Sequence, residues 1–335
     1  MYMRKISIFL TCMALFIGLV PINSQIKLKF NIEKKFKIVQ FTDVHYISGD
    51  VRSGAALDNI KEVLDAENPD LVIFTGDIVY GEPAGKGIRE VIGIVSERKI
   101  PFGVTFGNHD DEYDLSRAQL FEIVKDMPYN ITSTNPRITG ITNYIIPVMS
   151  SVDDKTAFLL YCFDSNAYSI IEDVKGYGYI NFDQIEWYKE QSASYTLNNG
   201  RVPVSAVAFF HIPLQEYNMA AADEQAIMTG TRKEKACAPE LNSGMFTAIK
   251  EMGDIMATFV GHDHDNDYAV LWKGIMLAYG RYSGGNTVYN NLKPNGARVI
   301  EITEGEKGFR TWIRLCNRSI IHDIRYPDFF LKDKD

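Results

Sequence analysis

Cysteine is scarce in this chain of 335 residues, and closely spaced cysteine pairs are absent. The chain has 4 cysteines, of which Cys12 lies in an apolar N-terminal run, and no two are spaced as Cys-x-x-Cys. A metal site built on thiolates is not expected, since such sites use closely spaced cysteine pairs. One disulfide could form among Cys162, Cys237 and Cys316, and none is required.

Positive charge is also in short supply. The net charge is -8 at pH 7, and the chain has no extended basic run. Binding to DNA or RNA requires lysine and arginine side chains that neutralise phosphates, so no nucleic-acid binding is expected. The same shortage gives no support to binding at an anionic membrane surface.

No apolar run reaches the ~20 residues that span a bilayer. The nearest candidate, residues 6–20, has 15 residues, follows Arg4 and Lys5, and precedes a short polar segment that ends in Ser24. This is the three-part pattern of a secretory signal peptide. We therefore expect residues 1–24 to be removed during export to the periplasm or the medium, with no stable membrane insertion afterwards. A membrane-anchored form is the alternative.

The hydrophobic pattern predicts a mixed α/β chain without a linker or repeat, so residues 25–335 are expected to form one domain. Apolar runs alternate with amphipathic helical patterns over residues 37–106, which is typical of a parallel β-α-β-α-β unit. The predicted strands are 37–41, 70–75, 101–106, 143–149, 157–163, 201–210, 255–260, 268–272, 275–279, 297–303 and 309–315. The predicted helices are 53–67, 87–98, 116–125, 183–194 and 243–252. The last four strands are expected to form an antiparallel meander, and residues 25–35 an edge strand. Two sheets with helices outside are the expected architecture.

Histidine is rare, and its placement is not random. Of 6 histidines, five follow apolar runs, in short polar clusters: His45, His109, His211, His262 and His264. Open α/β sheets bind ligands at the carboxyl ends of their strands. In Gly261-His262-Asp263-His264 the two imidazoles are two residues apart, so in extended backbone both face one point. Taken alone, a polar turn with two chance histidines explains this motif equally well.

The polar residues at these strand ends are too many for one metal ion. They comprise Asp43, His45, Asp77, Asn108, His211, His262 and His264, with His109 in addition. The set suits two ions that share a bridging carboxylate, a device for in-line displacement at phosphorus. Imidazole donors suit Zn, Fe and Mn among other metals.

These motifs, in this order, resemble the blocks of the calcineurin-like metallophosphoesterases. The matching blocks are Asp43-x-His45, Gly76-Asp77, Gly107-Asn108-His109-Asp110, His211 and Gly261-His262-x-His264. Segments 210–217 and 238–244 are similar to the purple-acid-phosphatase-like branch, in its short plant and fungal forms. The resemblance covers roughly residues 36–316. It implies a four-layer fold, a two-sheet sandwich flanked by helices. It also implies two metal ions (Fe, Zn or Mn) and hydrolysis of phosphate esters by a metal-bound hydroxide.

The resemblance also implies a role for each matching residue. The ligands of the first ion would be Asp43, His45 and His264. The ligands of the second would be Asn108, His211 and His262. Asp77 would bridge the two ions. His109 would contact the substrate and help the leaving oxygen depart, and Asp110 would orient the His109 ring.

Tyr80 departs from the family pattern. Purple acid phosphatases have an iron-binding tyrosine three residues after the bridging aspartate, but they lack a histidine at the position of His45. Both residues are present here and would compete for one coordination position. We favour His45 as the ligand and interpret Tyr80 as packing beside the site or contacting the substrate. Arg281 could also bind a phosphate oxygen, because guanidinium groups match phosphate; a surface arginine is the alternative.

Three functions remain in competition. The resemblance favours an acid-phosphatase-like enzyme that hydrolyses phosphomonoesters, either small molecules or phosphorylated substrates. A phosphodiesterase would use the same metal site. A metal-binding protein without catalysis is the third reading. It is disfavoured because all four residues that inactive members typically lose are present, namely Asp43, Asp77, Asn108 and His109.

Overall fold

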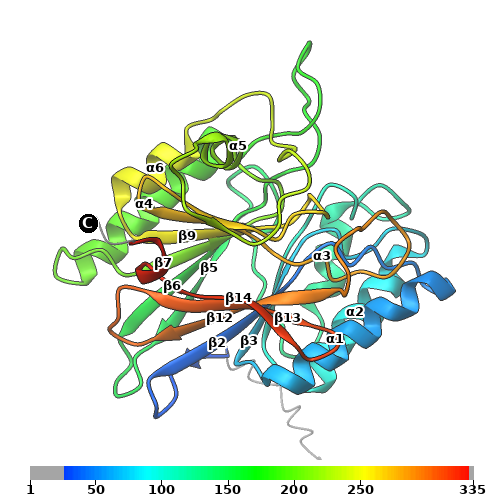
Figure 1. Ribbon diagram of the computed structural model, residues 1–335, viewed down its shortest axis with the longest axis horizontal. Coiled ribbons are helices and arrows are strands. Elements are labelled where there is room, and N and C mark those ends of the chain that lie inside the picture. The colour runs from blue at the N-terminus through cyan, green and yellow to red at the C-terminus, as the bar shows by residue number, and fades with distance from the viewer. Residues whose placement is uncertain (1–25, 332–335) are drawn as a thin grey trace, which may run out of the picture.

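The computed structural model describes residues 26–331 (Figure 1). The predicted signal peptide, residues 1–24, lies outside the described residues. Between residues 26 and 331, no helix combines the length and apolarity needed to cross a membrane. The three cysteines in this range are unpaired.

Two mixed β-sheets pack face to face in the centre of the molecule (Figure 1). The six-stranded sheet has the order β14-β13-β12-β2-β3-β4, and the eight-stranded sheet has the order β1-β5-β6-β7-β9-β11-β10-β8. The strands of the first sheet are β2 (Lys35–Phe41), β3 (Leu71–Thr75), β4 (Phe102–Thr105), β12 (Gly296–Thr303), β13 (Phe309–Leu315) and β14 (Ile320–Tyr326). Those of the second are β1 (Leu28–Lys29), β5 (Tyr144–Met149), β6 (Thr156–Cys162), β7 (Ala206–Phe209), β8 (Met228–Thr229), β9 (Ile255–Val260), β10 (Ala269–Trp272) and β11 (Ile275–Tyr279).

Helices cover the outer face of each sheet (Figure 1). The six-stranded sheet is covered by α1 (Gly54–Glu67), α2 (Ala84–Glu97) and α3 (Arg117–Lys125). The eight-stranded sheet is covered by α4 (Phe182–Asn198), α5 (Glu216–Ala222) and α6 (Met245–Met252). Short 3-10 turns lie at Val51–Ser53 and Asp328–Phe330. The predicted four-layer fold, two sheets flanked by helices, is confirmed.

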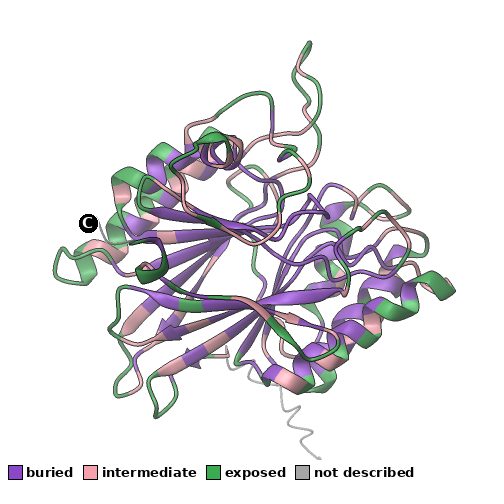
Figure 2. Ribbon diagram, viewed as in Figure 1, coloured by how far each residue is buried: buried purple, intermediate pink, exposed green. Residues whose placement is uncertain are grey.

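The central strands are mostly apolar on both faces, since helices cover one face and the other sheet covers the second. In β2, Val39 and Phe41 pack toward the helices, whereas Ile38 packs against the other sheet with Phe259 of β9. This follows from the two-residue period of a strand. Parallel strands buried on both sides read as continuous apolar runs, which is why the sequence pattern found them. Figure 2 shows buried residues concentrated in the two sheets.

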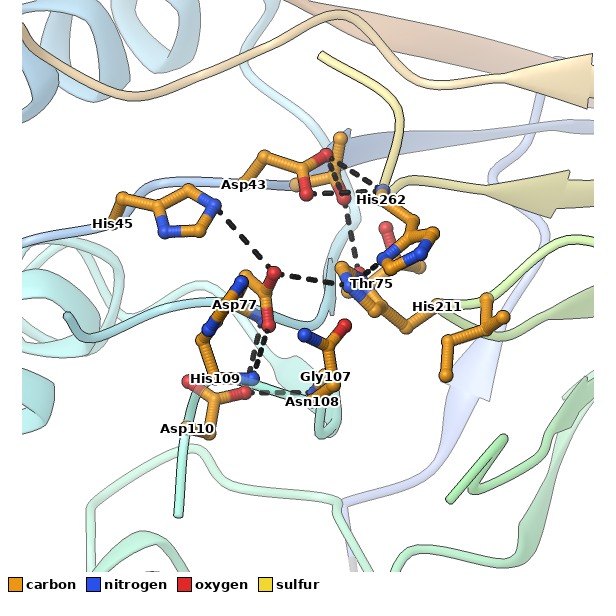
Figure 3. Close-up of polar contacts among 12 residues, drawn as sticks. Asp43, His45, Thr75, Asp77, Gly107, Asn108, His109, Asp110, His211 and His262 are labelled. Atoms are coloured by element: carbon orange, nitrogen blue, oxygen red, sulfur yellow. Dashed lines mark hydrogen bonds and ion pairs between the residues drawn. The ribbon is translucent and has the colours of Figure 1, made fainter. Parts of the chain in front are cut away.

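The parallel strands position the functional site. Strands β2, β3 and β4 are parallel neighbours, as the β-α-β-α-β pattern predicted, and β6, β7, β9 and β11 are parallel neighbours in the other sheet. Parallel neighbours end on the same edge of a sheet, and the loops that follow β2, β3, β4, β7 and β9 come together there (Figure 3).

The prediction of one antiparallel meander near the C-terminus is wrong. Strands β10 and β11 form a hairpin in the eight-stranded sheet, whereas β12 pairs with β2 and β13 in the six-stranded sheet. The chain crosses between the sheets in the loop after β11, and apolar alternation does not say which sheet a strand joins. Helix α5 and strands β8 and β14 were not predicted. Of the described residues ahead of β2, 26–34, only Leu28–Lys29 pairs as an edge strand.

Candidate metal centre

All seven predicted metal ligands lie in loops directly after strands, and all are at most 7% exposed. The six-stranded sheet supplies Asp43 and His45 after β2, Asp77 after β3 and Asn108 after β4. The eight-stranded sheet supplies His211 after β7, and His262 and His264 after β9. Figure 3 shows Asp77 between His45 and His211, in contact with both.

The donor atoms form two clusters, within each of which all atoms lie within 4.8 Å of one another. The first cluster is Asp43, His45, Asp77 and His264. The second is Asp77, His211 and His262. Asp77 belongs to both: its Oδ2 atom lies 3.5 Å from Nε2 of His45 and 3.1 Å from Nε2 of His211. One carboxylate at the centre of two ligand clusters is the arrangement that a dinuclear metal centre requires.

Unsatisfied buried atoms provide a test of whether cations fit this site. Within residues 26–331, Oδ1 of Asn108 and Nε2 of His262 are buried and have no hydrogen-bond partner. A buried polar atom without a partner is costly and uncommon in folded proteins. An oxygen acceptor and an imidazole nitrogen are both metal ligands, so the residues present fit the two ions that the family implies.

The backbone at the site is held in an unusual conformation. Asp43, His45, Asp77 and His262 have φ angles of 54°, 45°, 51° and 80°, in the left-handed region. Non-glycine residues rarely adopt this region, which costs of order 1–3 kcal/mol per residue and is found mainly at functional sites. Four of the seven predicted ligands therefore carry backbone strain that surrounding contacts must offset.

Glycines in front of the ligands make room for this convergence. A Cβ atom on Gly107 would collide with the carboxylate of Asp77, and one on Gly261 would collide with the hydroxyl of Thr42. Gly76 has a φ of +84°, and a Cβ there would lie 2.5 Å from Nδ1 of His211. The glycines of these motifs thus permit close approach of loops from both sheets.

Contacts outside the clusters orient two of the imidazoles. Nδ1 of His211 lies 2.7 Å from the carbonyl oxygen of Thr75, and Nδ1 of His264 lies 2.9 Å from that of Tyr289. A carbonyl oxygen only accepts, so Nδ1 carries the hydrogen in each ring. This leaves Nε2 toward the clusters, as in many metal sites.

Burial and charge set the protonation of the clustered groups. Burial lowers the pKa of His45 and His262 well below the usual value, so both rings are neutral and can ligate metal. Burial would also lower the pKa of His211, but the neighbouring Asp77 carboxylate raises it to about 9. Without cations, His211 therefore holds a proton that metal binding must displace.

Asp110 does not orient His109, and this prediction is wrong. Its carboxylate accepts hydrogen bonds from four backbone N–H groups, those of Asp77, Ile78, Val79 and Gly107, at 2.7–3.1 Å. Burial, together with the charge of Asp77, raises the Asp110 pKa to about 6. Asp110 therefore fixes the loops after β3 and β4 rather than the side chain next to it in sequence.

Glu112 takes the position predicted for Asp110. The His109 side chain is 28% exposed, unlike the buried ligands, and so marks the solvent-facing side, or mouth, of the site. Its Nδ1 atom is 2.6 Å from Oε2 of Glu112. The backbone N–H of His109 donates to Oδ1 of Asp77 at 2.9 Å, which ties this loop to the clusters. The only sequence signal for this contact is that Glu112 follows His109 by three residues.

Tyr80 lies beside the site, as expected from the sequence. Its ring packs edge-on against His45 and His109, with centroid distances of 5.0 and 5.2 Å, and against Tyr113 at 5.9 Å. His45 is a member of the first ligand cluster. Whether Tyr80 also touches substrate stays a prediction.

Arg281 is neither a surface residue nor directed at the clusters. Its buried guanidinium pairs with Asp267 and donates to the carbonyl oxygen of Pro294 at 2.7 Å. These contacts occupy the guanidinium inside the protein and do not favour the predicted phosphate contact.

Further tyrosines line the site, and none of them was predicted from the sequence as a site residue. The ring of Tyr177 packs edge-on against His262, with centroids 4.3 Å apart, and the ring of Tyr289 stacks on His264 at 4.5 Å. Tyr168 stacks on Tyr177 at 5.7 Å. They come from loops without periodicity, which left no pattern to detect.

The fold and the shared carboxylate define a class of metallophosphoesterase, and comparison with known families agrees. The family model for the calcineurin-like phosphoesterases matches residues 36–266. The chain belongs to this family.

Individual relatives support the purple-acid-phosphatase-like branch. The chain is 30% identical to a protein of Arabidopsis thaliana named probable inactive purple acid phosphatase 29, over 94% of this chain and 91% of the relative. It is 32% identical to phosphatase DCR2 of Saccharomyces cerevisiae, over 90% of this chain and 57% of that protein. The sequence resemblance is thereby confirmed.

A solved structure supports the fold. A dimetal phosphatase from Danio rerio superposes with a TM-score of 0.60 over 87% of this chain and 98% of that one, at 13% identity.

Proposed function

We propose that this chain hydrolyses phosphomonoesters with the aid of two metal ions. The observation that carries the proposal is the position of Asp77, whose carboxylate belongs to both ligand clusters. Family membership supports phosphoesterase activity.

Two metal ions at this site would activate an attacking water and neutralise charge on the phosphoryl oxygens. Fe, Zn or Mn suits the imidazole and carboxylate donors. The first ion would be held by Asp43, His45 and His264. The second would be held by Asn108, His211 and His262, with Asp77 shared between the two.

His109 is placed to act on the leaving group. Its Nδ1 atom faces the Glu112 carboxylate, which only accepts hydrogen bonds, so Nδ1 carries a hydrogen. Donation from the other nitrogen, Nε2, requires the doubly protonated ring, whose positive charge the Glu112 carboxylate stabilises; the hydrogen on Nε2 can then pass to the ester oxygen. As the P–O bond breaks, that proton neutralises the departing alkoxide, and the attacking water supplies the oxygen of the new P–O bond.

Two other functions are compatible with this site, a phosphodiesterase and a non-catalytic metal-binding protein. The Saccharomyces relative is named a phosphatase, which favours monoesters, but a diesterase could use the same metal site. The Arabidopsis relative is named probable inactive, which raises a non-catalytic metal-binding role. The complete donor set and the placement of His109 at its mouth support catalysis in this chain.

Metal analysis combined with two substrates tests the proposal. We expect two metal ions per chain, hydrolysis of 4-nitrophenyl phosphate, and slower hydrolysis of bis(4-nitrophenyl) phosphate. Faster diester hydrolysis would establish the diesterase. Two bound ions without hydrolysis of either ester would establish the non-catalytic function.

A further inference from the structure

A hairpin between β6 and α4 stands at the metal centre. Residues 166–178 are held as a hairpin by the antiparallel bridge of Tyr168 with Tyr177, and by the hydrogen bonds from Ser169 N to Gly176 O and from Gly178 N to Ala167 O, both 2.9 Å. Its tip is exposed, with Ile170 99% accessible. Figure 1 shows this segment as a green loop that extends away from the sheets.

The base of the hairpin contacts two predicted ligands. The Tyr177 ring packs against His262, as described above. The Tyr168 hydroxyl accepts a hydrogen bond from Nδ2 of Asn108 at 3.3 Å and donates one to Oε1 of Glu112 at 2.5 Å. The other oxygen of Glu112 contacts Nδ1 of His109. One chain of hydrogen bonds thus runs from a predicted metal ligand to the predicted leaving-group residue.

The chemistry of Glu112 sets the direction of every hydrogen bond in this chain. A carboxylate only accepts, so the Tyr168 hydroxyl must donate to it and can only accept from Asn108. Asn108 must then present its NH₂ group to Tyr168, which leaves Oδ1 as the atom available to a cation. In the same way Nδ1 of His109 must carry a hydrogen, which leaves Nε2 for the substrate.

We propose that Tyr168 and Glu112 are positioning residues that together fix the amide orientation of Asn108 and the ring of His109, whose Nδ1–H group is held against Glu112. The hydrogen bond between Tyr168 and Glu112 then affects two parts of the site. It affects the second metal site through Asn108 and the departure of the leaving group through His109. The role in leaving-group departure rests on the proposed function, whereas the role toward Asn108 does not.

Neither side chain is part of the hydrophobic core. The Tyr168 residue is 45% exposed and the Glu112 side chain 33% exposed. Conservative changes at these positions should therefore leave the fold intact, which thermal unfolding of each variant would verify.

Metal affinity tests the contact with Asn108 independently of activity. Zn²⁺ would be titrated into the metal-free full-length chain against a competing chelator. Tyr168→Phe keeps the ring and removes the hydroxyl, so we expect about 10–100-fold weaker binding of one of two ions, the usual effect of losing a contact to a ligand. Glu112→Gln should change affinity less, because a glutamine can still accept from Tyr168.

Tyr179→Phe is the matched control for this change. Tyr179 lies at the foot of the same hairpin, its ring packs near Phe182 with centroids 6.2 Å apart, and in the described part of the chain its hydroxyl makes no hydrogen bond. This control should bind both ions as the parent does. Wild-type affinity for both ions in Tyr168→Phe would overturn the proposed role toward Asn108.

Kinetics test the link to His109. Glu112→Gln and Tyr168→Phe should each lower kcat by about 10-fold or more, with little change in KM. The loss should be larger for glycerol 2-phosphate than for 4-nitrophenyl phosphate, since an alkoxide needs more help to leave. In the double variant the losses should be less than multiplicative, because both residues act through one chain.

The outcomes separate this inference from the proposed function. Multiplicative losses, or equal losses with both esters, would overturn the role toward His109. If the unmodified chain hydrolyses neither ester, the proposed function fails, and the Zn²⁺ titration still decides whether Tyr168 positions Asn108.

Discussion

The Nε2 atoms of His45 and His264 lie 3.0 Å apart, although the residues are 219 positions apart in sequence and belong to loops of different sheets. Two imidazole nitrogens at this distance can share at most one proton. Together with Asp43 and Asp77 they form a cluster of possible metal ligands. This cluster has more lone pairs than hydrogen atoms that could bond to them. This is the electrostatic environment that a cation stabilises.

Asp77→Asn should weaken both metal sites, because one carboxylate is common to the two clusters. We expect elemental analysis to find fewer than two metal ions per chain, with a matching loss of activity. Asp65→Asn is the control and should keep both ions. Asp65 is an exposed residue of α1 that forms an ion pair with Arg98. Full metal content with normal activity in Asp77→Asn would rule out a shared ligand.

His109→Ala should lower kcat by ~10²–10⁴-fold, the usual contribution of positioned acid–base help. Metal content should not change, because the variant removes no predicted ligand. The loss should be larger for alkyl than for aryl phosphates, and steady-state kinetics with both would show it. Equal losses for the two classes would mean that His109 does not act on the leaving group.

Tyr80→Phe should leave metal content and rate nearly unchanged, because His45 already supplies a donor to the first cluster. The unmodified protein should also lack the visible absorption band of a tyrosinate bound to iron. A coloured protein that bleaches in the Tyr80→Phe variant would show instead that Tyr80 is a ligand.

Arg281→Ala should reduce stability rather than substrate affinity. The change leaves the buried Asp267 carboxylate without its main partner, and breaking such a pair typically costs ~3–5 kcal/mol. Urea unfolding would measure the loss, and KM of the folded enzyme should change little. Arg318→Ala, at an exposed ion pair with Glu62, should leave the unfolding midpoint close to that of the parent. A large rise in KM with unchanged stability would restore the phosphate-binding role.

We also propose that the chain is exported and that residues 25–335 are the mature domain. Mass spectrometry of the protein from its native source should find an N-terminus near Gln25. A chain beginning at Met1 and recovered from the cytoplasm would contradict export.

The metal-ligand candidates could be found from the sequence because each follows an apolar run that the period-two pattern detects. Strand ends are local features, and parallel strands carry them to a common edge. The contacts around these candidates are not local in this sense. Tyr168 is 60 residues from Asn108 and 56 from Glu112, and it lies in a hairpin with no hydrophobic period.

Adjacency in sequence was a misleading guide for Asp110. Its side chain points to the backbone of the loops after β3 and β4, whereas His109 points to the mouth and meets Glu112. The prediction that the C-terminal strands form one meander was wrong for a related reason. Alternation shows that a strand has a buried face, but the loop after β11 contains no signal for the sheet that β12 joins.

Each ligand cluster draws on loops of both sheets: His264 joins Asp43 and His45 in the first, and His211 and His262 join Asp77 in the second. Neither sheet alone supplies the full donor set of either cluster. Occupation of both sites by their full donor sets would therefore require the two sheets to be docked. Chelation of the ions would correspondingly loosen this edge of the sandwich while the interior of each sheet keeps its own hydrogen bonds.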